Sequence, residues 1–151
     1  MTTLLIVAHA PLASALKALV AHVDAELESQ VEALDVGPGS SPEQVAAQAL
    51  ALLDRLGRPE TLVLADVAYA TPCNGVVRLL DDPSLRLRVL AGVNVPMLWR
   101  ALCYRARPLD ELLRLASDGA TSGVLPVTAQ PPPPMTPCSP ADAQVHDHDQ
   151  Q

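Results

Sequence analysis

The chain has no phenylalanine, one tryptophan and two tyrosines, so its interior must be built almost without aromatic side chains. Hydrophobic residues nevertheless make up 49% of the sequence, which predicts an aliphatic core of leucine, valine and alanine. Basic residues are also scarce, because 10 Lys and Arg face 17 Asp and Glu and leave a formal net charge of −7. Nucleic-acid binding needs clustered basic side chains, and docking to an anionic membrane needs a polybasic segment. The composition argues against both.

Long apolar runs are missing as well. No stretch approaches the roughly 20 apolar residues of a membrane helix, so we expect no direct insertion into a membrane. The apolar run 4–8 is short, follows no Lys or Arg, and is interrupted by His9 and Pro11, which is not the pattern of a secretory signal. The three cysteines have no CxxC spacing, and no zinc site is predicted. These absences predict a cytoplasmic protein without a metal centre.

The sequence does contain short apolar runs that alternate with longer stretches of helical spacing, in a length of 151 residues that suits one domain. This pattern is typical of an α/β domain with a mostly parallel sheet. We expect a flavodoxin-like, doubly wound fold of four strands flanked by helices. The strands are expected at about 3–8, 31–36, 61–67 and 86–91, and the helices at Leu12 to Leu27, after Ser41, after Thr71, after Pro96 and at about 109–117.

The carboxyl-terminal part of the chain has a different composition. The last helix is expected to end at Gly119, and residues 120–127 to add one short strand, which Pro126 would confine to an edge of the sheet. From residue 128 onward, four consecutive prolines and a polar finish predict a disordered tail. The predicted domain therefore spans residues 1–127, and the Pro-rich tail spans 128–151.

Polar residues stand at the ends of the first and third predicted strands. His9 comes directly after the first strand, and Asp66 lies at the end of the third. Doubly wound sheets bind ligands beyond the carboxyl ends of their strands, where the strand order reverses, and both residues fall there if these two strands are neighbours. A carboxylate that is hydrogen-bonded to one ring nitrogen fixes the imidazole tautomer and leaves the other nitrogen free as a nucleophile.

A helix start completes this group of residues. Thr71 is the expected cap of the third helix, and Thr71 to Asn74 would present unpaired N–H groups to an anion. Together with His9 and Asp66, they predict a phosphorylatable histidine. Each part also has a plainer interpretation, with His9 as a polar loop residue, Asp66 as a loop cap and Thr71-Pro72 as an ordinary helix start. Spacing alone leaves both interpretations open.

Three segments of the chain resemble one known family. They are Ile6-Val7-Ala8-His9-Ala10, the run from Asp66 to Asn74, and Gly92-Val93-Asn94-Val95-Pro96-Met97-Leu98. In this order and spacing they resemble the mannose-type IIA domain, a component of the bacterial phosphoenolpyruvate-dependent sugar phosphotransferase system. The similarity covers about residues 2–127.

The resemblance implies a function for the residues at the strand ends. His9 would accept phosphate from the histidine-containing phosphocarrier protein and pass it to a IIB domain, with Asp66 as its orienting partner. Thr71, Cys73 and Asn74 would steady the phosphoryl group. No metal or organic cofactor is implied, since positioning and electrostatics do most of the work in phosphoryl transfer. Family members are cytoplasmic homodimers that exchange a C-terminal strand between subunits, and residues 120–127 would take that role.

Two positions depart from the family pattern. Tyr69-Ala70 stands before Thr71-Pro72, where the family usually has Gly-Gly or Gly-Ala. If the loop needs a positive φ at this position, Tyr69 costs on the order of 1 kcal/mol more than glycine. Its ring would narrow access to His9, or its hydroxyl would contact the phosphate, which places Tyr69 among the phosphate-binding candidates. Ala8-His9-Ala10 replaces the common Thr-His-Gly, so a hydroxyl beside the histidine is missing.

Two other functions are compatible with the same fold. The first is a regulatory protein whose phosphorylation state at His9 controls binding to a target protein, without sugar transport. The acidic composition and the altered loop at Tyr69 are compatible with it. The second is a domain that binds a small ligand. It is disfavoured because no glycine-rich phosphate loop follows the first strand.

Overall fold

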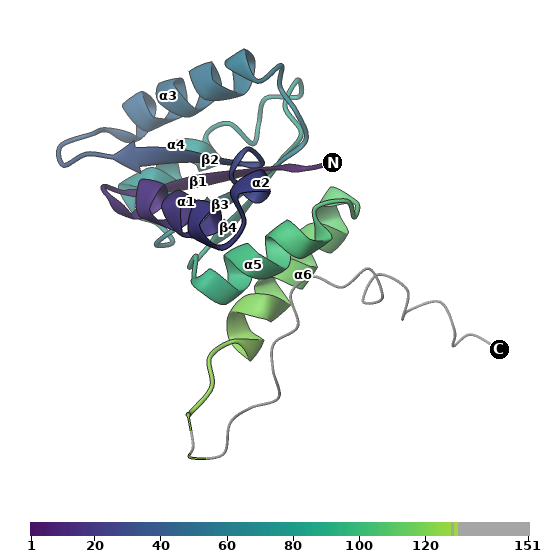
Figure 1. Cartoon of the computed structure of the whole chain (residues 1–151). Helices are drawn as coiled ribbons and strands as arrows, with labels where there is room; N and C mark the ends of the chain where they lie inside the picture. The colour runs from purple at the N-terminus through teal and green to yellow at the C-terminus, as the bar shows by residue number, and fades with distance from the viewer. Residues whose placement is uncertain (128, 130–151) are drawn as a thin grey trace.

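Four strands pair in parallel to form the central sheet of the computed structural model, which describes residues 1–127 and 129 (Figure 1). The strands are β1 (Thr3–His9), β2 (Val31–Val36), β3 (Thr61–Ala65) and β4 (Leu87–Ala91). Their order across the sheet is β2-β1-β3-β4, so the chain first moves outward to β2 and then returns to the other side of β1. The predicted four-stranded parallel sheet is confirmed. Except for residue 129, the predicted tail 128–151 lies outside the described residues.

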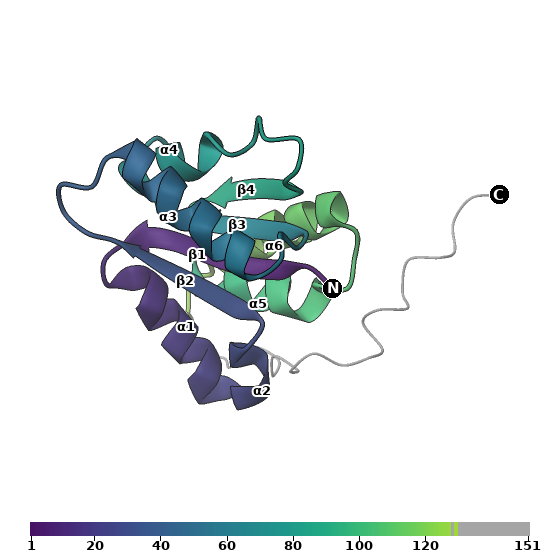
Figure 2. The ribbon, with the colours of Figure 1, turned by 90° about the horizontal axis from the view of Figure 1, so that it is seen from above.

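Helices cover both faces of this sheet. They are α1 (Leu12–Val23), α2 (Ala25–Glu28), α3 (Pro42–Arg55), α4 (Thr71–Val77), α5 (Val95–Tyr104) and α6 (Leu109–Ser122). Figure 1 shows α3 and α4 on the upper side of the sheet and α1, α5 and α6 on the lower side. Figure 2 looks down on α3 and shows the four strands fanned out beneath it. Among the helices of the described residues, none has the length and apolar character needed to cross a membrane.

The strands are buried on both faces because successive side chains point in opposite directions. In β1, Leu4 and Ile6 belong to the core shared with α1, α5 and α6, whereas Leu5 and Val7 belong to the core under α3 and α4. Both cores are aliphatic, as the composition predicts. The middle of β2 is half-buried, because this strand lies at an edge of the sheet.

The start of α3 follows the predicted capping chemistry. Ser41 accepts a hydrogen bond from the Gln44 N–H at 3.2 Å, and the Gln44 side chain accepts one from the Ser41 N–H at 2.9 Å. Pro42 occupies the first helical position, where its missing N–H costs nothing. Gly57, at φ +79, follows the end of the helix.

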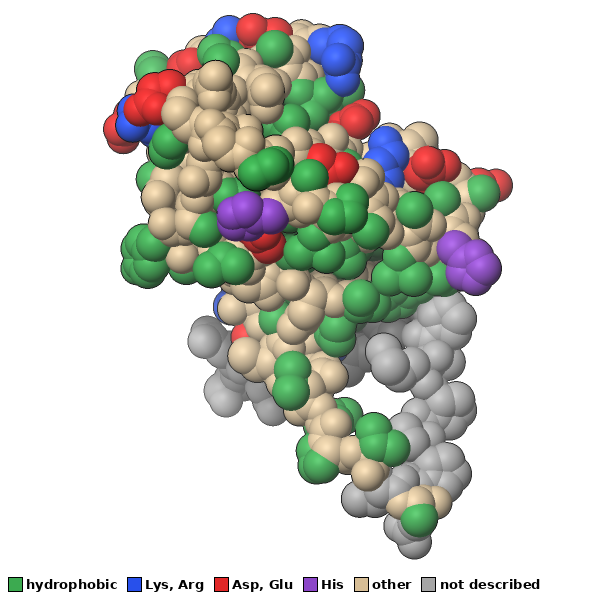
Figure 3. All heavy atoms as spheres, turned by 90° about the vertical axis from the view of Figure 1, so that its left-hand side faces the viewer, with side chains coloured by type: hydrophobic (Ala, Val, Ile, Leu, Met, Phe, Trp, Pro, Cys, Tyr) green, Lys and Arg blue, Asp and Glu red, His purple; other side chains and the backbone are tan. Residues whose placement is uncertain are grey.

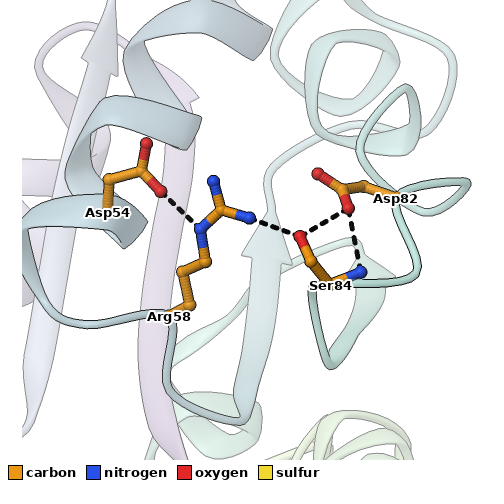
Figure 4. A network of polar contacts seen from close by, with 4 residues as sticks. All are labelled: Asp54, Arg58, Asp82 and Ser84. Carbon is orange, nitrogen blue, oxygen red and sulfur yellow. Dashed lines mark hydrogen bonds and ion pairs between the residues drawn. The ribbon is translucent and has the colours of Figure 1, made fainter.

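A polar network ties together the connections that lead into β3 and β4 (Figure 4). Arg58 donates from Nε to Asp54 Oδ1 at 2.6 Å and from its terminal nitrogen to the Ser84 hydroxyl. Ser84 donates from its backbone and its hydroxyl to Asp82 Oδ1, at 2.9 and 2.6 Å. Because all strands are parallel, this network lies at the end of the sheet opposite His9.

The stretch from Leu12 to Leu27, which we predict as one helix, forms two. Asp24 has an extended conformation, with φ −152 and ψ 104, and ends α1. Its carboxylate accepts a hydrogen bond from the Glu26 N–H at 2.9 Å and caps the short helix α2. An aspartate side chain that bonds to the nearby backbone competes with helix continuation, which explains the break.

The last helix is longer than predicted. Gly119 lies inside α6, where an added Cβ would stand 2.6 Å from Arg100 Cβ, so this glycine permits the close packing of α6 on α5. The predicted edge strand at 120–127 does not form in this chain, since α6 continues to Ser122 and residues 124–127 have no regular secondary structure. The exchange of this segment between subunits stays a prediction.

Candidate functional site

His9 and Asp66 meet at the carboxyl end of the sheet, where the strand order reverses. His9 is the last residue of β1, and Asp66 directly follows β3, its neighbour. Figure 3 views the molecule from the side toward which β1 runs in Figure 1. Hydrophobic and uncharged side chains occupy much of the centre of this face, while Lys, Arg, Asp and Glu gather mainly toward its upper edge and right side. The predicted placement of both residues at the carboxyl end of the sheet is confirmed.

One carboxylate oxygen of Asp66 holds His9 through two hydrogen bonds. Asp66 Oδ2 lies 2.7 Å from His9 Nδ1 and accepts the backbone N–H of His9 at 2.9 Å. The other oxygen, Oδ1, accepts the backbone N–H of Val67 at 2.8 Å. The Asp66 side chain is only 8% exposed, whereas the His9 side chain is 54% exposed. The carboxylate is therefore fixed in the protein, and the imidazole reaches into solvent.

These contacts keep Asp66 ionised. Burial raises the pKa of the Asp66 carboxyl, but hydrogen bonds from His9 and Val67 together outweigh burial and leave the pKa below its usual value. An ionised carboxylate only accepts hydrogen bonds, so His9 must carry its hydrogen on Nδ1. Nε2 then has its lone pair available. Among the described residues no group hydrogen-bonds to Nε2, and the exposed ring can act as a nucleophile.

The loop after β4 holds the backbone at Asp66 through two hydrogen bonds. The Gly92 N–H donates to the Asp66 carbonyl at 3.1 Å, and the Val93 N–H donates to the Ala65 carbonyl at 3.0 Å. Gly92 has φ +90, a conformation that favours glycine. Asn94 caps α5 by accepting the Met97 N–H at 2.8 Å. The sequence points to the segment from Gly92 to Leu98 through its resemblance to the family. It does not predict that this segment positions Asp66, because the contact is made by backbone atoms, which every residue type has.

A second carboxylate, Asp35, stands at the same end of the sheet and was not among the predicted site residues. It lies in β2 and pairs in register with Ala8. Its Oδ1 accepts the Ser14 N–H at 3.1 Å, and the Ser14 hydroxyl donates to the Pro11 carbonyl at 3.1 Å. Asp35 therefore steadies the first turn of α1, directly after His9. The position of an acidic residue near the end of a predicted strand is the only sequence feature that points to it.

The helix start at α4 differs from the prediction in one respect. Ala70, rather than Thr71, occupies the cap position, and no side chain caps this helix. Within the described residues, the N–H groups of Thr71 and Cys73 donate to no acceptor. Cys73 is a buried free thiol. Asn74 uses its side-chain amide to donate to the Tyr69 carbonyl at 2.8 Å, so it holds the preceding loop. A role of these residues toward phosphate stays a prediction.

Tyr69 has the positive φ that the family's small residue at this position suggests. Its φ is +65, and its side chain is 90% exposed. The left-handed conformation costs an ordinary side chain about 1–2 kcal/mol relative to the common backbone conformations. The Asn74 amide and a 3.4 Å hydrogen bond from the Ala70 N–H to the Val67 carbonyl hold the loop in this shape.

The variant Tyr69→Gly is expected to raise the free energy of unfolding by about 1 kcal/mol, because glycine adopts this φ without a steric penalty. The exposed ring contributes little burial that could be lost. Urea unfolding would measure the change as a higher midpoint with an unchanged slope. Tyr69→Ala is the matched control, since it removes the ring but keeps Cβ at positive φ. Equal stabilisation by both variants would show that the ring, and not the backbone, is the source of strain.

Comparison with known proteins identifies the family. The family model described as PTS system fructose IIA component, where PTS denotes the phosphotransferase system, matches residues 3–114. The chain belongs to this family. The match includes His9, Asp66 and the Gly92 loop, and it confirms the resemblance seen in the sequence. The protein is therefore a member of the IIA component family of the sugar phosphotransferase system. The comparison with curated proteins found no match.

Solved structures of IIA proteins have the same fold. The mannose/sorbose specific IIA subunit from Enterococcus faecalis is 26% identical with a TM-score of 0.75, and the alignment covers 89% of this chain and 98% of that one. The EIIA component from Streptococcus agalactiae is 24% identical with a TM-score of 0.72, over 83% of this chain and 97% of that one. The IIA protein associated with the fucose utilization operon of Streptococcus pneumoniae is 21% identical with a TM-score of 0.56, over 78% and 93%.

Proposed function

We propose that this IIA component carries a phosphoryl group on His9, which it accepts from the histidine-containing phosphocarrier protein and passes to a IIB domain. The observation that carries the proposal is the 2.7 Å contact between His9 Nδ1 and Asp66 Oδ2, made by an imidazole that is 54% exposed. Family membership supports phosphoryl transfer over other reactions of an imidazole. The protein then works as a protein-histidine phosphotransferase in the cytoplasm, as a homodimer and without a cofactor.

The transfer needs only the groups that surround His9. The lone pair on Nε2 attacks the phosphorus of the donor's phosphohistidine. The donor's N–P bond breaks as the new N–P bond forms, and its electron pair stays on the donor nitrogen. The His9 ring gains positive charge in this step, and the ionised Asp66 stabilises that charge through the Nδ1–H hydrogen bond. The second transfer, to the IIB domain, runs through the same atoms in reverse.

The start of α4 is the proposed binding place for the phosphoryl oxygens. The N–H groups of Thr71 and Cys73 have no acceptor within the described residues, and such groups at a helix start favour an anion. The Thr71 hydroxyl and Asn74 are further donors. Four residues separate Asp66 from Thr71, so the loop that orients the imidazole also leads into this helix.

A labelling experiment tests the proposal. The full chain is incubated with labelled phosphoenolpyruvate, enzyme I and the phosphocarrier protein, and the labelled residue is located by mass spectrometry. We expect one phosphoryl group per chain, on His9, in the acid-labile form typical of phosphohistidine. The exposed His22 of α1 serves as the matched control, and His22→Ala is expected to label like the wild type.

Two results would contradict the proposal. Label on another residue would exclude His9 as the carrier, and absence of label on a chain whose partner proteins are phosphorylated normally would exclude the relay altogether. A third result separates the two functions that the sequence left open. Labelled His9 that passes no phosphate to a IIB domain would favour the regulatory protein over the sugar-transport component.

A further inference from the structure

Tyr69 is an exposed aromatic side chain three residues after Asp66, the hydrogen-bond partner of His9. The chain has two other aromatic residues, and both Trp99 and Tyr104 are partly buried against the core. Tyr69 is 90% exposed, although it sits in a loop whose first residue is nearly buried. The positive φ makes this a strained place for a bulky residue. A strained residue that displays a large apolar ring in the loop that holds a reactive group indicates a function for the ring.

Tyr69 lies in the loop that begins with Asp66, the hydrogen-bond partner of His9, and so stands close in the chain to the centre of any protein interface at His9. Tyr69 follows Asp66 by three residues, which span at most about 11 Å of chain. A protein interface of standard size covers about 800 Å² on each partner, equivalent to a disc of about 16 Å radius. A partner that delivers a phosphoryl group to His9 Nε2 must cover this disc. The ring, which has on the order of 150–250 Å² to bury, would form a substantial part of the contact.

Two other exposed apolar residues lie close in the chain to His9 and Asp66. Val67 lies in the same loop, and Leu12 stands three residues after His9 at the start of α1. Both side chains are exposed. We call Leu12, Val67 and Tyr69 the apolar rim. Figure 3 shows hydrophobic side chains gathered on the central part of this face, with most charged groups farther out. An apolar centre with a polar surround is the usual anatomy of a protein interface.

Hydrogen bonds hold the backbone of the loop that carries the Tyr69 ring. The Asn74 amide donates to the Tyr69 carbonyl at 2.8 Å, and the Asp66 carboxylate and carbonyl are held by Val67 and Gly92. A backbone that is already ordered loses little conformational entropy when a partner docks. Tyrosine has few rotatable bonds and is common among residues that dominate binding energy.

The geometry points to Tyr69 as the residue that anchors the phosphocarrier protein on the apolar rim, through burial of its ring against an apolar patch of that protein around its phosphohistidine. This inference rests on the proposed function of His9. It assigns Tyr69 to partner binding through the ring, in place of a contact between its hydroxyl and the phosphate. Tyr69 is thus a residue for partner selection that the family's small residues at this position do not provide.

Transfer kinetics test the inference. Initial rates of phosphoryl transfer from the phosphorylated phosphocarrier protein to the full chain are measured over a range of phosphocarrier concentrations. We expect Tyr69→Ala to raise KM about tenfold, the effect of removing an interface anchor, with kcat within about twofold of wild type. Tyr69→Phe keeps the ring and is expected to retain the wild-type KM. Val23→Ala, at an exposed apolar position at the far end of α1, is the matched control and is expected to change neither constant.

The outcomes separate this inference from the proposed function. A KM for Tyr69→Ala within twofold of wild type would overturn the inference. If Tyr69→Phe were as impaired as Tyr69→Ala, the hydroxyl would be the important group and the inference would be wrong. A fall in kcat at unchanged KM would assign Tyr69 to the transfer step and would overturn it as well. If wild-type protein took no label from an active phosphocarrier, the proposed function would fail, and the inference would fail with it.

Discussion

Replacement of Asp66 by alanine is expected to slow phosphorylation of His9 by about 10²–10⁴-fold, at most the roughly 10⁴-fold loss found when the aspartate that orients a catalytic histidine is replaced in a serine-protease triad. Asp66 Oδ2 accepts both the backbone N–H and the ring Nδ1–H of His9, so the substitution frees the ring to rotate and to change tautomer. It also removes the negative charge that stabilises the ring as it becomes cationic. The rate of transfer from the phosphocarrier protein, at saturating concentration, measures the loss.

Two further variants show which property of Asp66 is important. Asp66→Asn keeps an acceptor oxygen but loses the charge, and we expect a smaller loss than for alanine. Asp35→Asn is the matched control, because Asp35 stands at the same end of the sheet and bonds to Ser14 instead of His9. We expect its rate to stay within about threefold of wild type. Equal losses at positions 35 and 66 would mean that negative charge in general, and not the contact with His9, supports the reaction.

The main parts of this site follow from simple sequence rules. The alternation of apolar runs and helical stretches predicts parallel strands, and the carboxyl ends of parallel strands all lie at the same end of the sheet. Two polar residues at the ends of neighbouring strands must then lie near each other. His9 and Asp66 satisfy this rule, and their contact is the result. This rule does not predict how close the two side chains come. The 2.7 Å contact between His9 and Asp66 also depends on the hydrogen bonds that the Gly92 loop makes to the backbone at Asp66.

Those loop contacts are what the sequence does not reveal. The hydrogen bond from the Gly92 N–H to the Asp66 carbonyl joins residues far apart in the chain through backbone atoms, which every residue type provides. The role of Gly119 is also hidden in the sequence, where this glycine is typical of a helix end. In the structure it lies inside α6 and permits this helix to pack closely on Arg100. Glycine has several structural uses, and only the three-dimensional neighbours distinguish between them.

Gly75 has another such packing role, and its replacement by valine is expected to lower the free energy of unfolding by about 3 kcal/mol. Gly75 lies inside α4, where an added Cβ would stand 2.5 Å from both Cβ and Cγ1 of Val45 and 3.0 Å from the Pro42 carbonyl. Val45 is fully buried in α3, so neither helix can move without disturbing the core between the sheet and these two helices. The loss of stability is expected at the upper end of the range for overpacked cores. The added valine atoms would meet the branched Val45 side chain and the Pro42 backbone carbonyl, and neither can move away easily. Urea unfolding measures the effect.

Gly37 provides the matched control for this substitution. It lies between β2 and α3, and an added Cβ would meet nothing within 4 Å. Gly37→Val is therefore expected to change the stability by no more than about 0.5 kcal/mol, as at most surface positions. Combining Gly75→Val with Val45→Ala removes Cγ1 from the crowded contact and should recover part of the loss, because the two residues share one space. If the two substitutions were simply additive, the close approach of α4 to α3 would not be the cause of the lost stability.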